Sequence, residues 1–521
     1  MIAFERIVRH IPVMFAFCAI LLLAGYMRFM HVADNPAWYT DEGTHISIAH
    51  HLLQGRVQYF AVTDSMLVFA RPPLFHACLA VVSAILGEGI ATLRGFTAGL
   101  GVLATALVFM LAYAFYPTRK AGFALWVAFL YAVYPQAILY TRFGFSYALL
   151  TPLVLLIALL LTRHIQTGRW NSLALAGILA GIGLLGDIMM GAVIIVVGVF
   201  SLFRSPKMVI WLLPLMALPF GIYAGILGLL HPSALFFDLN FTLNRLGGIP
   251  ITRQLNTIAE NLTMLLSTDL WFPLGMVGIF LIRPPALRVV CIALLLLPII
   301  IIGRTVALFH LSLYYMSPLF PLLILGVASL TWTGGAYVIS NAMMLFEHMR
   351  YIQKMPIRVH ELLAGGMYML LIGAPLFFIN QHMLNGIHTR IQTAIDPFLV
   401  DSADGEAVIA YFEAQDTADK LILASPSIGW ALEVYTSAHV ADWQMHIAYI
   451  GYDAVHLPHD LPHERYAFIP TVDHADYVVI DNIWRNWGNV HIPQAVVLYQ
   501  TVVDTWELVY RAGTLDVYAR P

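Results

Sequence analysis

Apolar runs long enough to cross a lipid bilayer recur along this chain, and they restrict its possible folds more than any other feature. A transmembrane helix needs about 20 mainly apolar residues to cross a hydrocarbon core roughly 30 Å thick. Hydrophobic residues make up 60% of the chain and charged residues only 11%, whereas a soluble domain carries about 25% charged residues. The sequence therefore predicts a polytopic α-helical membrane protein.

We expect about eleven transmembrane helices, with the N-terminal run retained as the first of them. The run "PPLFHACLAVVSAILG" (72–87) is not counted, because as a helix it would be only about 24 Å long. We predict that it lies on the outer membrane surface. The candidate spans are residues 11–30, 95–116, 121–139, 147–162, 172–186, 188–203, 208–229, 270–283, 287–303, 312–336 and 361–380.

The distribution of basic residues supports this assignment. With 72–87 outside the bilayer, the N-terminus and five later turns share one side, and the positive-inside rule identifies that side as the cytoplasm. If 72–87 crossed the membrane, the basic turns would be split between both sides. The basic residues concerned are Arg6, Arg9, Arg119, Lys120, Arg163, Arg169, Arg204, Lys207, Arg283, Arg288, Arg350, Lys354 and Arg358.

The end of the chain has a different pattern, so we predict two domains: a transmembrane module over 1–384 and a small α/β domain over 385–521. "DKLILAS", "DYVVIDN" and "WELVYRAGTLDVYAR" predict strands, the last a hairpin that turns at Ala512–Gly513. "ADGEAVIAYFEAQ" predicts a helix. A segment of about 130 residues can hold its own core. The predicted topology places this domain outside the cell.

The first outer loop contains two adjacent carboxylates, Asp41 and Glu42, in the stretch "AWYTDEGTHISIAHHLLQG" (37–55). Thr40 or Asp41 is expected to N-cap a short helix that stops at Gly55 and lies along the membrane surface. Capping does not explain Glu42. An acidic pair at a membrane edge is suited to two tasks: a general base with its orienting partner, or a pair of metal ligands.

Basic residues on the predicted outer side are all arginines, whereas the lysines of the membrane portion (Lys120, Lys207 and Lys354) are all cytoplasmic. The planar guanidinium group binds phosphate in a bidentate manner. The alternative is that each arginine only extends its charge to the membrane interface.

A net charge of −3 gives no basic field for nucleic acid, which excludes that partner. The outer ionisable residues are Asp41, Glu42, Arg71, Arg94, Arg142, Asp187, Asp238, Arg245, Arg253, Arg304 and His310.

The order of these motifs resembles the glycosyltransferase C superfamily, and within it the protein O-mannosyltransferase and lipid A aminoarabinose-transferase type (glycosyltransferase families 39 and 83). The acidic pair is followed by "RPPLF" (71–75), "LRGFTAGLGVLATALVFMLAY" (93–113), "YPQAILYTRFGFSYALL" (134–150) and "YYMSPLFPLLIL" (314–325). The terminal "DYVVIDN" and "VYRAGTLDVYAR" resemble the end of the family's extracytoplasmic domain.

The resemblance implies a plasma-membrane enzyme that transfers a sugar from a polyprenyl-phosphate donor to a lipid, glycan or protein acceptor outside the cytoplasm. Asp41 matches the family's favoured catalytic base, and Glu42 is grouped with it as catalytic. Direct displacement would invert the anomeric centre. The residues expected to bind the lipid phosphate are Arg71, Arg94, Arg142, Arg304 and His310, and those expected in the acceptor or sugar pocket are Tyr59 and Tyr315.

Two positions depart from the family pattern. The aminoarabinose-transferase branch has a carboxylate and a lysine before its Pro-Pro pair, where this chain has Ala70 and Arg71. That difference argues against a metal site built on that carboxylate, although a divalent metal elsewhere stays open. Asp187 stands where the family frequently has a lysine.

The competing function is a transporter or lipid flippase with a charged cavity. Many transporters are built from internal repeats, but the two halves of this chain show no internal repeat.

Overall fold

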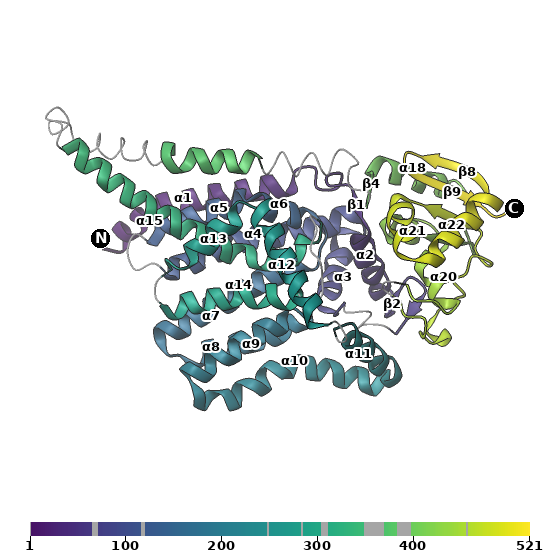
Figure 1. Ribbon diagram of the computed structural model, residues 1–521, viewed down its shortest axis with the longest axis horizontal. Helices are drawn as coiled ribbons and strands as arrows, with labels where there is room; N and C mark the ends of the chain where they lie inside the picture. The colour runs from purple at the N-terminus through teal and green to yellow at the C-terminus, as the bar shows by residue number, and fades with distance from the viewer. Residues whose placement is uncertain are drawn as a thin grey trace.

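The computed structural model describes residues 2–64, 71–115, 120–246, 250–282, 285–303, 311–347, 369–382, 398–454 and 457–521. Long helices form a bundle that makes up most of the molecule, and a sheet with its own helices lies at one end (Figure 1). Between these two parts lie helix α2 (Thr40–Leu53), helix α3 (Leu74–Leu86) and the short strands β1 (Trp38–Tyr39) and β2 (Gln58–Tyr59).

The bundle fits an integral membrane protein. Among the described residues, five helices are long and apolar enough to span a bilayer, or up to seven if each of two bent pairs forms one span. The larger count of about eleven stays a prediction, and residues 361–368 of its last candidate lie outside the described ranges. The main helices are α1 (Ile2–Phe29), α4 (Ile90–Phe115), α5 (Lys120–Val133), α6 (Pro135–Arg142), α7 (Tyr147–Thr167), α8 (Trp170–Leu184), α9 (Met190–Arg204), α10 (Val209–Leu230), α11 (Pro232–Leu246), α12 (Ile251–Thr268), α13 (Trp271–Ile279), α14 (Pro285–Gly303) and α15 (Phe320–Glu347).

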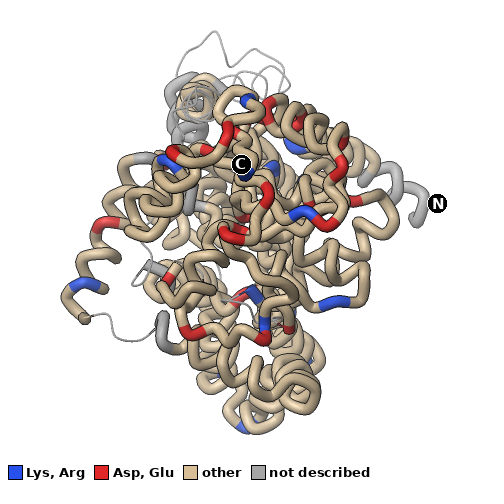
Figure 2. The backbone as a smooth tube through the Cα atoms, turned by 90° about the vertical axis from the view of Figure 1, so that its right-hand side faces the viewer, with Lys and Arg blue, Asp and Glu red and all other residues tan. Residues whose placement is uncertain are grey.

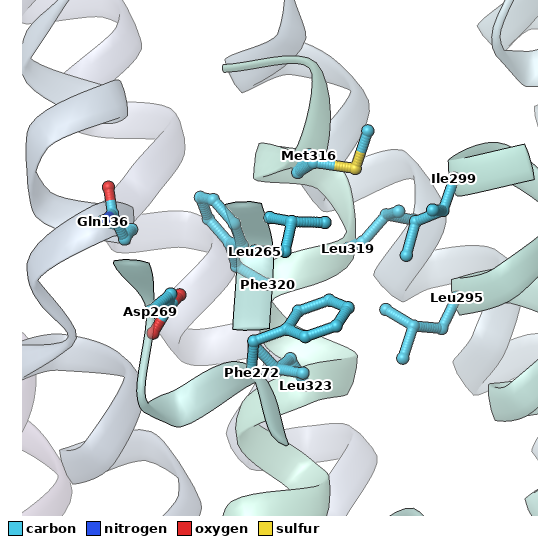
Figure 3. Close-up of a pocket in the computed structure, with 10 residues that line it drawn as sticks. All are labelled: Gln136, Leu265, Asp269, Phe272, Leu295, Ile299, Met316, Leu319, Phe320 and Leu323. Carbon is cyan, nitrogen blue, oxygen red and sulfur yellow. The ribbon is translucent and has the colours of Figure 1, made fainter. Parts of the chain in front are cut away.

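The two bent pairs meet inside the bundle. Helices α5 and α6 bend by 56° at Tyr134, where Pro135 begins the second helix and has no N–H to continue the first. Helices α12 and α13 bend by 103° near Asp269. The Tyr134 hydroxyl donates to the Asp269 carboxylate and joins the two breaks. A small, mainly apolar pocket lies beside this contact (Figure 3), lined by Gln136, Leu265, Asp269, Phe272, Leu295, Ile299, Met316, Leu319, Phe320 and Leu323.

The run 72–87 forms a helix, as predicted. Helix α3 covers Leu74–Leu86 and begins two residues after Pro72. Phe75, His76 and Leu79 are buried against the neighbouring elements. Val81 and Ile85 are exposed large apolar residues on the other side of the same helix. This amphipathic pattern suits a helix that packs on the protein with one face and on lipid with the other. Its place on the outer membrane surface stays a prediction.

The C-terminal sheet has the strand order β6-β5-β7-β9-β8. Strands β5 (Leu421–Ala424), β6 (His439–Asp442) and β7 (Tyr477–Ile480) are parallel, and β8 (Glu507–Ala512) and β9 (Leu515–Ala519) add an antiparallel hairpin. The three predicted strand segments therefore form strands, whereas β6 was not predicted. The predicted helix is α18 (Ser402–Glu413). The predicted boundary between residues 384 and 385 lies outside the described residues.

The C-terminal region attaches to the segment around helix α2 through backbone contacts. Strand β1 pairs with β4 (Leu399–Val400), and strand β3 (Val62–Thr63) forms a bridge with Tyr466. Helix α2 packs directly on α19 (Pro426–Tyr435). Figure 2 looks onto this end of the molecule, where both acidic and basic positions occur. The carboxyl ends of β5 and β6 lie near helix α2 and strand β2, because Pro426 after β5 approaches Gly43 and Asp442 at the end of β6 contacts Tyr59.

Candidate active site

Helix α2 begins one residue earlier than the capping prediction required. Its first residue is Thr40, and the N-cap position belongs to Tyr39. The Tyr39 backbone N–H donates to the Glu42 carboxylate at 3.0 Å, which is the return bond of a capping box. The expectation that Thr40 or Asp41 caps the helix is therefore wrong. Glu42 accepts a hydrogen bond from the backbone N–H at the N-terminus of the helix. The Asp41 carboxylate is therefore not needed for capping and can bind other groups.

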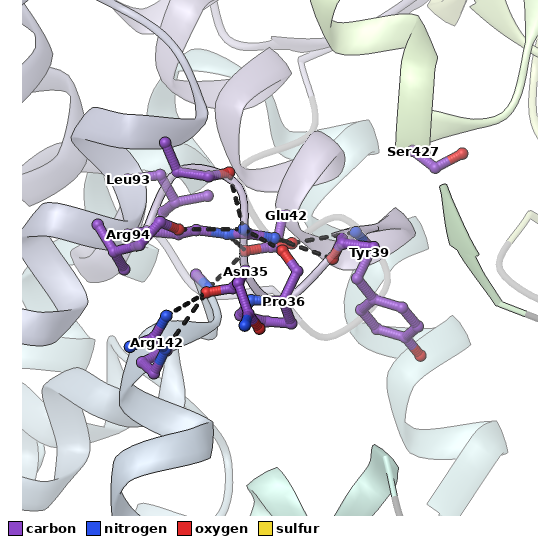
Figure 4. A network of polar contacts seen from close by, with 12 residues as sticks. Asn35, Pro36, Tyr39, Glu42, Leu93, Arg94, Arg142 and Ser427 are labelled. Carbon is purple, nitrogen blue, oxygen red and sulfur yellow. Dashed lines mark hydrogen bonds and ion pairs between the residues drawn. The ribbon is translucent and has the colours of Figure 1, made fainter. Parts of the chain in front are cut away.

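Glu42 is also the centre of a buried ion pair with Arg94 (Figure 4). The Nε and Nη2 atoms of Arg94 each donate to Glu42 at 2.7 Å, and the Gly144 N–H donates at 2.7 Å. Arg94 Nη1 also donates to the carbonyls of Val32 and Ala33. Both charged side chains are 0% exposed. Neither group faces an open site, so they hold α2, α4 and the end of α1 together.

Arg142 has a similar bracing contact. Its Nη2 donates to the Asn35 carbonyl at 2.7 Å, and its Nη1 donates to the Met27 carbonyl at 3.1 Å. These contacts fix the turn that follows α1 (Figure 4). Arg94 and Arg142, both expected to bind phosphate, therefore bind backbone carbonyls of the chain itself. Arg304 and His310, the other expected phosphate ligands, lie outside the described residues.

Asp41 occupies a different environment from Glu42. Arg71 Nη2 donates to one carboxylate oxygen of Asp41 at 2.8 Å, and the Tyr314 hydroxyl donates to the other at 3.2 Å. The Asp41 side chain is 19% exposed and that of Arg71 is 21% exposed. Within the described part of the chain, buried Arg71 Nη1 has no hydrogen-bond partner. Asp41 and Arg71, which the sequence analysis named for separate roles, thus form a partly exposed ion pair.

Aromatic side chains extend from this contact. The ring of Tyr314, in the short helix η3 (Leu311–Leu319), stacks on Phe145 with centroids 4.1 Å apart. Tyr315 and Tyr147 lie 4.5 and 5.3 Å from the Tyr314 ring. Tyr147 in turn hydrogen-bonds Asp187. The structure thus brings the predicted Tyr315 close to Asp41, together with Tyr314, Phe145 and Tyr147, which lie within the quoted motifs but were given no role from the sequence.

Tyr59 approaches the same region from strand β2. Its hydroxyl donates to the Asp442 carboxyl at 3.1 Å, and both residues are buried. Burial raises the pKa of Asp442 to about 7 and raises the pKa of Tyr59 well above its usual value. Burial alone would lower the pKa of Arg71, but the adjacent Asp41 carboxylate raises it above its ordinary value. Sequence reasoning missed Asp442, since only tertiary structure brings it to this loop.

Two buried histidines support the turn that holds Arg71. His76 Nδ1 lies 3.3 Å from the Pro72 carbonyl, and His76 Nε2 lies 2.8 Å from His45 Nδ1. A carbonyl only accepts, so His76 carries its proton on Nδ1, and its Nε2 accepts from His45. Burial lowers the pKa of His45 well below its usual value. The pair therefore stays neutral and connects α2 to the start of α3.

The donor set around Asp41 does not suit a divalent cation. Its carboxylate oxygens are bonded to a guanidinium group and a phenol, whereas hard cations prefer several oxygen ligands of negative charge. No group of three or more His, Cys, Asp or Glu residues is gathered for a metal within the described ranges. The groups that bind Asp41 therefore do not form a site for a divalent cation.

This fold is similar to that of two solved membrane-protein structures. The crystal structure of ArnT from Cupriavidus metallidurans bound to undecaprenyl phosphate superposes with a TM-score of 0.63 at 12% identity, covering 96% of this chain and 97% of that chain. The apo oligosaccharyltransferase of Archaeoglobus fulgidus gives 0.55 at 13% identity, covering 91% and 70%. The chain therefore shares its overall fold with these two structures.

A family model points the same way. Residues 70–229 match the family described as dolichyl-phosphate-mannose-protein mannosyltransferase. Among curated protein sequences, none matches the chain significantly. The resemblance to the glycosyltransferase C superfamily predicted from the sequence is thus confirmed by the family model and by the fold.

Proposed function

We propose that this protein transfers a sugar from a polyprenyl-phosphate donor to an acceptor on the extracytoplasmic side of the membrane, with Asp41 as general base. One observation carries the proposal. The partly exposed carboxylate of Asp41 lies between Arg71 and Tyr314, beside a row of aromatic rings. The undecaprenyl phosphate in the similar ArnT structure supports a polyprenyl-phosphate ligand here as well.

The proposed reaction is a single displacement. Asp41 removes the proton of an acceptor hydroxyl while its oxygen attacks the anomeric carbon of the sugar. The bond between that carbon and the phosphate oxygen breaks, and polyprenyl phosphate leaves with the bonding electrons. The Arg71 guanidinium group, whose side chain is 21% exposed, can donate to a leaving phosphate oxygen. Asp41 then releases its proton to water. A single displacement inverts the anomeric centre.

The remaining predicted residues take different roles in this proposal. The part-buried rings of Tyr315 and Tyr147, which pack against the buried Tyr314, offer a stacking surface for a sugar ring. Glu42 and Arg94 give the site its rigidity, since both are fully buried. Burial without access leaves them no contact with a substrate. We therefore assign catalysis to Asp41 and not to the acidic pair as a unit.

A transfer assay with an isosteric variant tests the proposal. Purified protein in liposomes is supplied with radiolabelled polyprenyl-phosphate sugars and with candidate acceptors. Asp41→Asn should lower transfer by about 10²- to 10⁴-fold, the usual contribution of a general base, while binding of polyprenyl phosphate is retained. Asp453→Asn, a change at an exposed C-terminal carboxylate, should transfer at the wild-type rate.

Two results would contradict the proposal. A folded Asp41→Asn protein with full transfer activity would exclude the base role. Movement of lipid or sugar across sealed vesicles without any covalent product would favour the transporter or flippase instead.

A further inference from the structure

A closed series of contacts links the proposed base to the guanidinium group that faces it. The Asp41 carboxylate accepts from Arg71 at 2.8 Å. Arg71 is joined by a peptide bond to Pro72, whose carbonyl oxygen lies 3.3 Å from Nδ1 of His76. His76 Nε2 lies 2.8 Å from Nδ1 of His45, which follows Asp41 by four residues on α2. Residues four apart share a helix face, so the series returns to Asp41.

The Pro72 carbonyl lies at the very start of α3 and takes its donor from a side chain. The backbone bond that closes the first turn runs from the Ala77 N–H to the Pro73 carbonyl at 2.9 Å, and the Pro72 carbonyl faces the ring of His76 instead. Proline fixes its own φ angle and restricts the residue before it to extended conformations. With the Pro72 carbonyl held, the backbone from which the Arg71 side chain projects has a fixed direction.

The two histidines and the start of α3 are themselves tightly held. The side chains of His45 and His76 are both buried. The ring of His45 lies edge-on to the buried ring of Phe75, with centroids 4.9 Å apart. On the other side, the Leu74 N–H donates to the Leu185 carbonyl at 2.8 Å, which joins α3 to the turn after α8. Small movements of this turn are therefore resisted from two directions.

The hydrogen bonds in this series run in one direction. Since the Pro72 carbonyl only accepts, His76 carries its proton on Nδ1, and its Nε2 accepts from His45. The other neutral form of His76, with its proton on Nε2, would turn a lone pair toward the Pro72 carbonyl. The N–H of His45 therefore selects the tautomer of His76 that can hold this carbonyl.

We infer that His76 is a positioning residue of the proposed transferase, and that His45 keeps it in the required tautomer. By holding the Pro72 carbonyl, His76 sets the direction of the Arg71 guanidinium group relative to Asp41 and to the phosphate of the donor. This inference rests on the proposed function. Both histidine rings are buried between α2 and α3, so they act through Arg71 and not on the substrate.

Two substitutions of His76 separate its hydrogen bond from its volume. His76→Asn keeps an N–H donor near the place of Nδ1, whereas His76→Leu fills a similar volume without a donor. For folded, full-length protein in liposomes, His76→Leu should lower the rate of sugar transfer by about ten- to a hundredfold, the effect of a misplacement of roughly 1 Å in an active site. His76→Asn should transfer at close to the wild-type rate, because it still donates to the Pro72 carbonyl.

His164→Leu is the matched control. His164 is also buried, but it lies at the end of α7 opposite to Tyr147. Its ring has the same kinds of partner as that of His76. Nδ1 lies 3.0 Å from the Arg169 carbonyl, and Nε2 lies 3.2 Å from the Ser205 hydroxyl. His164→Leu should lower the thermal midpoint, whereas the transfer rate per folded molecule should equal that of the wild type.

A double-mutant cycle with Arg71→Lys distinguishes positioning from a general loss of stability. If His76 acts through Arg71, His76→Leu should lower transfer by less than about threefold in the Arg71→Lys protein, because the group that it orients is already replaced. A purely structural effect would lower the rate by the same factor in both backgrounds. Equal factors would therefore overturn the inference.

His45→Phe provides a second variant, should His76→Leu fail to fold. Phenylalanine keeps an aromatic ring against Phe75 but cannot donate to His76. The tautomer of His76 is then no longer selected, so transfer should fall, and it should fall less in the Arg71→Lys protein. Wild-type transfer by folded His45→Phe would overturn the inference.

The outcomes separate this inference from the proposed function. If the wild type transfers sugar and folded His76→Leu transfers as fast as His164→Leu, His76 has no positioning role and the transferase proposal stands. If the wild type transfers no sugar from the polyprenyl-phosphate donors supplied, the proposed function and this inference both fail.

Discussion

The carboxylates of Asp41 and Glu42, consecutive residues in the first turn of α2, lie in separate environments. Asp41 is partly exposed and bonds to Arg71 and Tyr314. Glu42 is completely buried and bonds to Arg94. Consecutive residues on an α-helix point about 100° apart, so an adjacent acidic pair can divide into one group that faces the site and one that faces the core.

This division predicts different consequences for two isosteric changes. Glu42→Gln leaves the buried Arg94 charge without its counter-ion, which should lower the free energy of unfolding by about 3–5 kcal/mol. Asp41→Asn removes a charge that is partly solvated, so its thermal midpoint in detergent should stay close to that of the wild type. Thermal unfolding of both variants checks this. Equal midpoints would show that the buried pair is not essential for stability.

Arg71 should be sensitive to a change that preserves its charge. A lysine at this position keeps the positive charge but has no second planar N–H group for a phosphate oxygen. We expect Arg71→Lys to weaken polyprenyl-phosphate binding by about tenfold, which corresponds to roughly 1.4 kcal/mol. Direct binding measurements give the result. Arg253→Lys, at an exposed position on α12, is the control and should bind normally.

Local patterns in the sequence are sufficient to predict several elements. The strands β5 and β7, the β8–β9 hairpin and the helix after Pro72 follow from hydrophobic spacing and turn residues. Asp41 and Arg71 are candidates from the sequence because both are charged residues beside apolar runs. Their contact with each other depends on how α2 and the start of α3 pack, and no local pattern specifies that packing.

Two contacts at the site lie beyond local sequence patterns for a common physical reason. The sequence predicts that Arg94 binds a substrate phosphate, but Arg94 is occupied by Glu42 and by backbone carbonyls. Burial decides between these roles, and no local pattern indicates whether a helical arginine faces a cavity or a buried acid. Asp442 escapes prediction for a related reason, since its partner Tyr59 is 383 residues away. Only tertiary structure supplies such contacts.

The close approach of α2 to α19 predicts a strict requirement for glycine at position 43. A Cβ atom there would lie 1.7 Å from the Pro426 carbonyl oxygen, so Gly43→Ala should separate the two helices. In an open helical position the same change usually stabilises by about 0.5–1 kcal/mol. Gly95→Ala on α4, where nothing lies within 4 Å, is therefore the control.

We expect a clearly lower thermal midpoint and faster proteolysis between the two regions for Gly43→Ala. Gly95→Ala should unfold at or slightly above the wild-type temperature. Wild-type stability in Gly43→Ala would mean that the interface tolerates a shift of backbone atoms and is looser than the structure indicates.

The same interface contains a buried carboxyl group, Glu433 on α19. Its Oε1 lies 3.6 Å from Nε2 of His51 on α2, and its Oε2 has no partner among the described residues. Burial raises the pKa of Glu433 to about 8 and lowers the pKa of His51 to about 4. At pH 7 both groups are neutral, so the contact is not an ion pair. The other groups that influence Glu433 are Ser47, Arg56 and Glu88.

Glu433 should therefore make stability depend on pH in a defined direction. Between the ordinary glutamate pKa of about 4.3 and the folded-state value of about 8, the folded protein holds a proton that the unfolded chain has lost. Its contribution to stability is complete below pH 4 and declines by up to about 1.4 kcal/mol per pH unit until about pH 8. Glu433→Gln has no proton to lose, so its thermal midpoint should fall less than that of the wild type between pH 6 and 8. Parallel curves for the two proteins would show that Glu433 is ionised in the folded state, which would require the interface to admit water.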